Sequence, residues 1–272
     1  MKRWDMDKLD WGKFRKDKVD PDIVPIIKAA SVVERNSVEY VIYLKNVFAD
    51  DPEIIAAVED WAVEEIQHGD ALGKWASLAD PTWDYQEAFA RYQKNFSLKL
   101  DVDSSIRGSK TGELIARSMV ETGTSSFYTA LGDSTEEPAL KELCRLIAAD
   151  ELRHYKLFYD QMNRYMKREQ LNRWQRARIA LGRVAESEDD ELATAYHTTN
   201  NPPNMPYVHK RNIAAYMSRA MQYYQPHHFR RVVSMICKVI GFTPSDRVNK
   251  ILSYMVYYLV SKRQHYYKKL TL

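Results

Sequence analysis

The sequence predicts an all-helical protein. Hydrophobic residues make up 45% of the 272 residues, which is enough for a core, and only 9 residues are glycine. Apolar residues recur at intervals of three and four over long stretches, which is the spacing that places them on one face of a helix. Scarce glycine and clustered proline favour long helices over a sheet protein with many tight turns.

The starts of the helices in the first half of the chain are marked by their capping residues. An acidic or hydroxyl side chain accepts from the free N–H groups of the first turn, and proline fits the first helical positions. Segments of this kind recur between the apolar stretches. The predicted starts, in chain order, are Asp20 with Pro21, Asp51 with Pro52, Pro81, about residue 111, and Glu136 or Glu137.

The last hundred residues are expected to add further helices. The segment "LNRWQRARIALGRVAE" has helical character, whereas "HTTNNPPNMPYVHK" is too rich in Pro and Asn and is expected to be a loop. Three more helices are expected near residues 208–224, 227–240 and 245–269. We therefore predict a single domain, 1–272, with a helical bundle over about 21–165 and accessory helices over about 170–272.

Four of the predicted helices carry an apolar stripe that is interrupted by charged or polar side chains. Two helices contribute a lone glutamate, and two contribute a glutamate followed three residues later by a histidine. Residues three apart lie one turn apart on the same helix face, so each Glu–His pair can reach one metal ion. In chain order these residues are Glu34, Glu65 with His68, Glu121, and Glu151 with His154.

Four carboxylates and two imidazoles are the ligand set of helix bundles that hold two iron ions. Four carboxylates balance the charge of two ferrous ions, whereas uncompensated buried charges are strongly destabilising. A carboxylate-rich site also leaves metal positions open for dioxygen. The alternative, two surface Glu–His pairs on solvated helix faces, is disfavoured because the surrounding stripe residues are apolar.

The segments "WAVEEIQHGDALGKW" and "AADELRH" resemble the two metal motifs of plant-type acyl-[acyl-carrier-protein] desaturases, which are soluble ferritin-like di-iron enzymes. The likeness extends to "VERNSVEY" and "VETGTSSF", so it covers roughly residues 25–165. It implies a ferritin-like four-helix bundle with additional flanking helices. It also implies two iron ions, O2 as co-substrate, and a double bond introduced into a fatty acyl chain. The implied iron ligands are Glu34, Glu65, His68, Glu121, Glu151 and His154.

The resemblance carries over to residues beside the ligands. Thr124 matches a threonine next to the oxygen-binding face, which implies a catalytic role. Asp150 matches an aspartate that hydrogen-bonds a ligand histidine, here His68, and such a contact fixes the imidazole tautomer. In the family this aspartate also links to a tryptophan near the N-terminus on the electron route. Trp11 is the better candidate for that tryptophan and Trp4 the weaker.

The resemblance also implies partners: an acyl carrier protein that bears the substrate, a ferredoxin-type electron donor and a second copy of the chain in a homodimer. The basic segment "MKREQLNRWQRARIALGR" would suit an acidic carrier, although such a run is usually a solvated helix face. The net charge of +3 and the lack of any RNA- or DNA-binding signature argue against nucleic acid.

The sequence also favours a cytoplasmic protein. The longest apolar run, around residues 251–260, is too short to span a bilayer. The two cysteines, Cys144 and Cys237, stand far apart, so a disulfide framework is excluded and a reducing compartment is expected.

Other functions fit the same ligands. A hydroxylase or N-oxygenase of the same superfamily would keep the cluster and act on another substrate. A ribonucleotide reductase subunit fits less well, because Leu72 stands where its radical tyrosine would be. A non-enzymatic ferritin-like protein that stores iron or scavenges oxygen would need little beyond the bundle. A bundle that serves as a binding module without metal would not need six ligands. The region after residue 170 aligns poorly with the plant enzymes. In that family this part helps shape the lipid channel and the carrier docking face, so the resemblance does not fix the substrate, its chain length or the position of the double bond.

Overall fold

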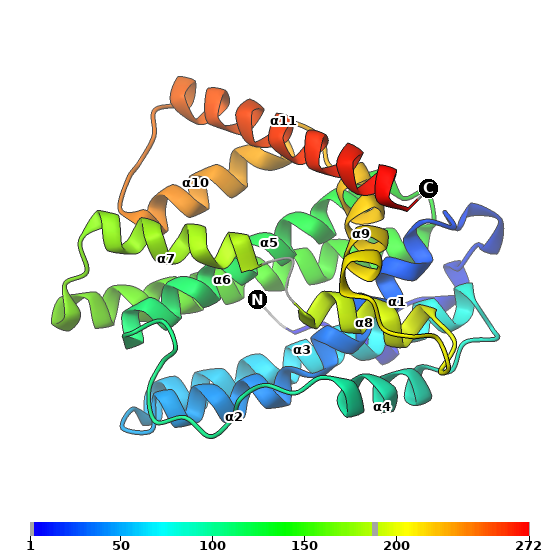
Figure 1. Ribbon diagram of the computed structural model, residues 1–272, viewed down its shortest axis with the longest axis horizontal. Coiled ribbons are helices and arrows are strands. Elements are labelled where there is room, and N and C mark those ends of the chain that lie inside the picture. The colour runs from blue at the N-terminus through cyan, green and yellow to red at the C-terminus, as the bar shows by residue number, and fades with distance from the viewer. Residues whose placement is uncertain (1–2, 187–189, 272) are drawn as a thin grey trace.

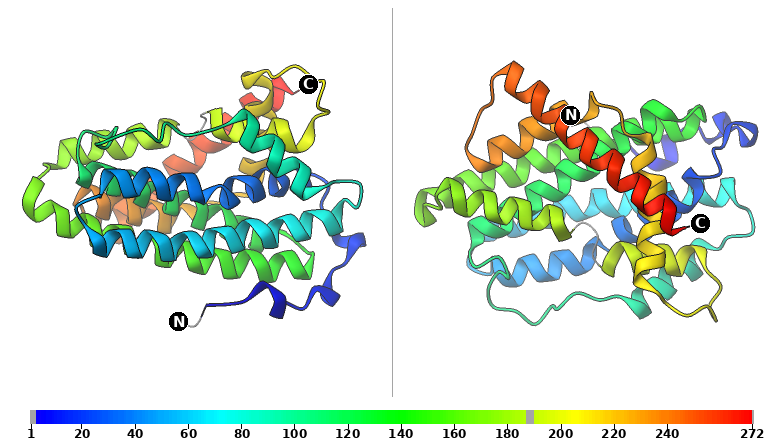
Figure 2. Two further views of the ribbon diagram at one scale, coloured as in Figure 1. Left: turned by 90° about the horizontal axis from the view of Figure 1, so that it is seen from below. Right: turned by 45° about the horizontal axis from the view of Figure 1, so that its top comes forward.

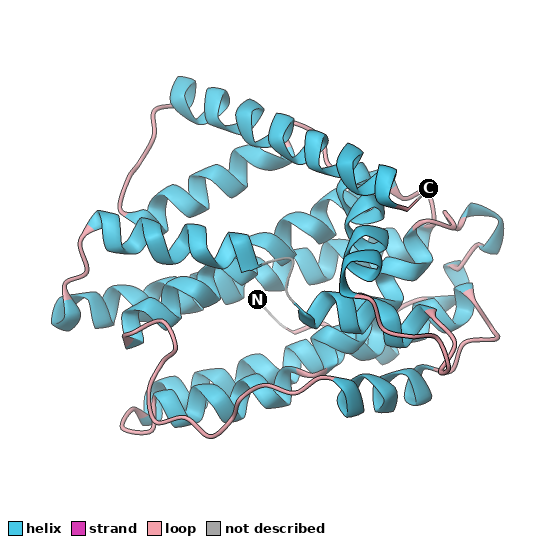
Figure 3. Ribbon diagram, in the orientation of Figure 1, coloured by secondary structure: helices cyan, strands magenta, loops and turns pink. Residues whose placement is uncertain are grey.

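The computed structural model describes residues 3–186 and 190–271, and every regular element in these ranges is a helix (Figure 3). The prediction of an all-helical fold is therefore confirmed. Three short 3-10 helices lie in the first 18 residues. The α-helices are α1 (Ile23–Arg35), α2 (Ser37–Val47), α3 (Pro52–Ala79), α4 (Tyr85–Asn95), α5 (Lys110–Ser134), α6 (Pro138–Glu169), α7 (Arg173–Ala185), α8 (Asp190–Asn200), α9 (His209–Ala220), α10 (His228–Ile240) and α11 (Asp246–Leu270).

The centre of the molecule is a bundle in which α1 packs on α3 and α5 packs on α6 (Figures 1 and 2). The two pairs meet where α3 contacts α6. A break at Asn36 ends α1, and α2 then continues along α3. Because of that break, Val38, one helical turn after Glu34 in the sequence, does not share the buried face of α1 and is exposed.

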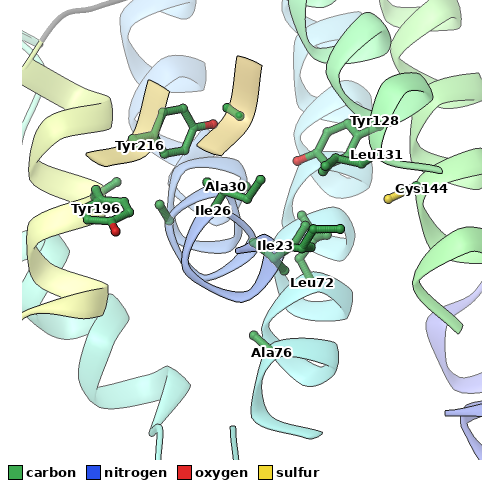
Figure 4. Packing of buried hydrophobic residues seen from close by; sticks show 14 of the residues in the cluster. Ile23, Ile26, Ala30, Leu72, Ala76, Tyr128, Leu131, Cys144, Tyr196 and Tyr216 are labelled. Carbon is green, nitrogen blue, oxygen red and sulfur yellow. The ribbon is translucent and has the colours of Figure 1, made fainter. Parts of the chain in front are cut away.

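Two apolar clusters fill the bundle, one on each side of a central polar zone. On α3, Val58 belongs to one cluster and Leu72 to the other. On α6, Phe158 and Ile147 are divided in the same way. Figure 4 shows part of the Leu72 cluster, where side chains of α1, α3 and α5 converge. The polar residues between the two clusters are thus closed off at both ends by close-packed side chains.

Most predicted helix starts agree with the structure, and two differ. Asp51 caps α3, and Glu137 caps α6 by accepting from the Ala139 and Leu140 N–H groups. The first helix, expected from Asp20, begins at Ile23. The helix expected near Pro81 begins at Tyr85, because the Asp80 carboxylate accepts from the Thr82 N–H and holds the chain in a turn.

The segment expected to be a loop from His197 onward is helical as far as Asn200. Its threonines are buried, and the Thr198 hydroxyl donates to the Thr194 carbonyl one turn earlier. Contacts of α8 with α1, α4 and α9 hold these residues in a helix, so tertiary packing overrides the local preference.

The accessory helices cover one flank of the bundle (Figure 1). Helices α7 and α10 pack on α5 and on each other, α8 packs on α1, and α9 packs on α8. Helix α11 lies outermost and contacts α9 and α10. Among the described residues, no helix combines the length and apolarity that a membrane crossing requires.

Candidate metal centre

The structure brings all six predicted ligands together in the polar zone between the two apolar clusters. Helix α1 supplies a glutamate near its end, α5 supplies another in its middle, and α3 and α6 each supply a Glu–His pair. All six side chains are buried, and His68 has no exposed surface at all. These residues are Glu34, Glu65, His68, Glu121, Glu151 and His154.

The six residues form two adjoining groups of possible metal ligands. Ligand atoms of Glu34, Glu65, His68 and Glu151 all lie within 4.8 Å of one another. Those of Glu65, Glu121, Glu151 and His154 meet the same condition. Glu65 and Glu151 belong to both groups, so their carboxylates lie between two neighbouring positions. This is the arrangement expected where carboxylates bridge a pair of metal ions.

The polar atoms that face the centre of the cluster support a metal site. Nδ1 of His68 and of His154 and Oε1 of Glu65, Glu121 and Glu151 are buried and have no hydrogen-bond partner among the described residues. His154 Nδ1 lies 2.9 Å from Glu65 Oε1 and His68 Nδ1 lies 3.2 Å from Glu151 Oε1, but neither contact has the angle of a hydrogen bond. Buried polar atoms without partners are destabilising, and metal ions at the centre would satisfy them. Carboxylates with imidazoles suit ferrous iron.

The opposite nitrogen of each imidazole is held by an acidic residue from the other helix. His68 Nε2 lies 3.1 Å from Asp150 Oδ2, as the sequence led us to expect. His154 Nε2 lies 2.9 Å from Glu64 Oε2, a contact that the sequence analysis missed. Both contacts leave Nδ1 directed at the cluster and fix the ring orientation. Arg153 ties the two acids together by donating to both carboxylates.

Glu64 could have been found from the motif itself. In "DELRH" an acidic residue, Asp150, directly precedes the glutamate ligand, and in "EEIQH" Glu64 stands in the same place. Each acid precedes a predicted ligand on its own helix and contacts the histidine of the facing helix. Burial tends to raise the pKa of Glu64, but hydrogen bonds with His154 and Arg3 lower it to about 2. Glu64 is therefore ionised at neutral pH.

The tryptophan that contacts Asp150 is Trp4. Its indole N–H donates to Asp150 Oδ2 at 2.7 Å, and its ring lies parallel to the His68 ring with centroids 6.0 Å apart. Trp11, which we ranked first, donates instead to the Met6 carbonyl and lies under the Lys74 ammonium. The ranking is corrected because the N-terminal segment passes Asp150 at residue 4, whereas residues 11–13 lie near the start of α6, where Lys13 pairs with Glu142.

Two hydroxyl groups contact the carboxylates. The Thr124 hydroxyl donates to Glu151 Oε2 at 2.6 Å, so the threonine singled out by the resemblance touches one of the shared carboxylates. The Tyr128 hydroxyl donates to Glu34 Oε1 at 2.5 Å, and this tyrosine is fully buried. Both hydroxyls come from α5, one turn apart. They fix the positions of one carboxylate from each of two other helices.

The titration behaviour of the cluster reflects crowded, buried charge. Burial raises the pKa of Glu34, Glu65 and Glu121, that of Glu121 to about 8. Burial alone would lower the pKa of His68, but the Asp150 and Glu151 carboxylates raise it to about 9. Protons thus supply the positive charge that the carboxylates require. Metal ions would replace those protons.

The basic segment and the pair His227–His228 lie outside the cluster. In the basic segment, Arg176 donates to the Val239 carbonyl at 2.7 Å and so joins α7 to α10. Lys167, Arg168, Arg173 and Arg178 are exposed. His227 and His228 lie near Asp133, but His228 Nδ1 accepts from the Gln225 N–H. The proton of a neutral His228 is then on Nε2, which donates to Asp133. Nε2 therefore has no lone pair with which to bind a metal.

A family model described as fatty acid desaturase matches residues 48–179. The matched range runs from just after α2 into α7 and contains five of the six clustered residues, with Glu34 before it. No curated protein matches the chain at a significant level. The match supports a desaturase-like oxidoreductase that uses iron, and the buried cluster is able to bind metal. Residues 48–179 are therefore similar to a fatty acid desaturase domain, and this region carries most of the candidate metal centre.

Proposed function

We propose that the protein is a di-iron, O2-dependent oxidoreductase that introduces a double bond into a fatty acyl chain carried by an acyl carrier protein. The observation that carries the proposal is the pair of four-residue groups that share Glu65 and Glu151, with unpartnered ligand atoms directed at their centre. The desaturase match over residues 48–179 supports this substrate class. The resemblance of the motifs to acyl-carrier-protein desaturases supports the carrier.

The six ligands would hold two iron ions, which supply the activation of dioxygen and the oxidising power needed to remove two hydrogen atoms from the acyl chain. The protein positions the ligands and excludes water from the site. Asp150 and Glu64 keep Nδ1 of each histidine directed at the cluster. The apolar clusters on both sides exclude water, which would otherwise compete for the open metal positions.

Thr124 is the residue that we expect to act beside the ligands. Its hydroxyl proton lies on the hydrogen bond to Glu151 Oε2, so it can hold that carboxylate in one orientation or pass a proton at Oγ1. The contacts from Trp4 through Asp150 to His68 support an electron route from the surface near the N-terminus. The ferredoxin-type donor, the homodimer and the cytoplasmic location stay predictions of the resemblance.

The test is to reconstitute the purified protein with iron, reduce it chemically, and add oxygen with and without an acyl carrier protein that bears a saturated acyl chain. Faster oxygen consumption with the acyl carrier and an unsaturated product would support the proposal. Loaded iron with no response to acyl carrier would refute the desaturase assignment and direct attention to hydroxylation or N-oxygenation. Assembly into a large shell that accumulates iron would favour storage.

A further inference from the structure

Helix α11 lies outermost in the fold (Figures 1 and 2). Its outward face between residues 251 and 259 is apolar. Ile251 is 60% exposed, Met255 57% and Leu259 62%, although the opposite face buries Ser253. Tyr254 and Tyr258 extend the same face and are also more than half exposed. A surface helix normally directs a charged side toward water, but residues 251–260 contain no charged residue, so apolar side chains face the solvent here. A contiguous exposed apolar patch of this kind marks an interaction surface.

The C-terminal part of the chain, which carries this face, is strongly positive. Residues 201–272 contain twelve Lys and Arg residues and a single acidic residue, Asp246. This segment therefore carries a net charge of +11 in a chain of +3, and the first 200 residues carry −8. Asp246 is itself paired with Arg230. On α11 the apolar stretch is preceded by Arg247 and Lys250 and followed by Lys262, Arg263, Lys268 and Lys269.

This charge pattern disfavours a second copy of the chain as the occupant. An antiparallel pairing about a two-fold axis near Met255 would set Arg247 of one copy against Arg263 of the other. A parallel pairing would set each lysine of the face against itself. Either pairing brings like charges together at the edges of the interface, which destabilises the complex. The surface that binds this face must instead be apolar where it meets the middle of the face and negatively charged around that area.

We infer that the outward face of α11 docks on the surface of a bilayer that contains anionic lipid, with the helix lying in the membrane plane. Ile251, Met255 and Leu259 would enter the boundary between headgroups and acyl chains. The tyrosines suit the headgroup level, where an aromatic ring meets apolar surface and its hydroxyl meets water. The flanking Lys and Arg side chains would reach up to the lipid phosphates. This inference does not depend on the chemistry of the metal centre.

Vesicle co-sedimentation tests the inference. The full-length protein is mixed with vesicles of pure phosphatidylcholine, or with vesicles in which about a third of the lipid is phosphatidylglycerol. We expect sedimentation with the anionic vesicles, at least about tenfold weaker binding to the neutral ones, and weaker binding as salt rises. No sedimentation with anionic vesicles at low salt would overturn the inference.

Variants separate the apolar contribution from the electrostatic one. The triple substitution Ile251→Ser, Met255→Ser and Leu259→Ser should reduce binding to anionic vesicles at least about tenfold, since apolar burial supplies much of the affinity of such helices. Its circular dichroism should match the parent because these side chains are exposed. The matched control, Val38→Ser, Ile42→Ser and Val63→Ser, removes exposed apolar groups from α2 and α3 and should bind as the parent does.

A charge variant and a sizing measurement complete the design. Lys262→Glu, Lys268→Glu and Lys269→Glu should remove the preference for anionic vesicles. Full binding by the Ser variant of α11 would overturn the inference, because adsorption would then be electrostatic only. A dimer that the same variant dissociates would overturn it in favour of a second copy. Absence of vesicle binding together with charge-dependent binding of an acidic carrier protein would assign the surface to that protein instead.

Discussion

The Glu64 carboxylate, on α3, lies 2.9 Å from Nε2 of His154, on α6. Asp150 of α6 makes the equivalent contact with His68 of α3, so the same kind of contact occurs in both directions between the two helices. Each acid is the residue directly before a predicted glutamate ligand, so the two helices support each other's histidine. The pair gives the candidate metal centre an approximate internal symmetry, in which Glu65 and Glu151 belong to both groups of possible ligands.

Glu64→Ala should weaken iron binding about 10–100-fold, because His154 loses the partner that fixes its tautomer and ring orientation. Glu64→Gln should lose less, since the amide oxygen can still accept from Nε2. Competition with a coloured iron chelator measures the affinity. Glu59→Ala, on the same helix but in an exposed ion pair with Lys45, is the control and should bind iron as the parent does. Equal affinity in Glu64→Ala and Glu59→Ala would show that Glu64 has no role at the metal.

Tyr128→Phe removes the hydroxyl that donates to Glu34 at 2.5 Å. We expect the metal-free protein to lose about 1–2 kcal/mol of stability, since a buried carboxylate loses a hydrogen bond. We also expect a shifted absorption spectrum of the iron-loaded protein, because Glu34 is freed to reorient. Urea unfolding and absorption spectroscopy measure the two effects.

The control for this variant is Tyr155→Phe, which removes a buried hydroxyl that donates to the Met235 carbonyl. It should lose comparable stability and keep the parent spectrum. If the two variants cannot be distinguished by their spectra, the contact of Tyr128 with Glu34 has only a structural role.

Iron(II) binding should release protons and strengthen as pH rises. In the metal-free cluster the raised pKa of Glu121, about 8, and that of His68, about 9, leave both groups largely protonated at neutral pH. A ligand must give up its proton to bind metal, so lower pH favours the metal-free form. Anaerobic calorimetry in buffers of different ionisation enthalpy counts the protons released. An affinity that does not change between about pH 6 and about pH 7.5 would contradict this account of the cluster.

Thr124→Val keeps the shape of the side chain and removes the hydroxyl that donates to Glu151 Oε2. Iron content should stay at the parent level, because all six ligands remain. The rate of oxygen consumption or the product outcome should change. Thr129→Val, on the same helix, removes a hydroxyl that donates to the Ser125 carbonyl and should behave as the parent does. If Thr124→Val consumes oxygen and forms product as the parent does, Thr124 takes no part in the reaction.

The sequence was sufficient to predict that the six residues cluster, because each one interrupts an apolar stripe at helical spacing. Helix periodicity alone places such residues inside, and the order of the motifs brings four helices together. Trp4 could not be chosen over Trp11 in the same way, since the N-terminal segment has no long helical period and its path is set by contacts such as that of Gln67 with the Trp4 carbonyl.

The structure was needed for two further features. The break at Asn36 turned Val38 outward, and local sequence gave no sign of it. The helical state of residues 197–200 depends on packing against α1 and α9, which outweighs the weak helix preference of Thr and Asn. The apolar outward face of α11 can be read from spacing, but only the position of the helix on the outside of the fold shows which face is exposed.

The most direct test of the metal centre is the iron content of the parent and of Glu151→Ala after anaerobic reconstitution and removal of loosely bound metal. Glu151 belongs to both ligand groups, so its loss should strip most of the iron and reduce stability when iron is present. The account predicts about two iron ions per chain in the parent and few in the variant. A parent that binds no iron, or a variant that keeps the full amount, would contradict it.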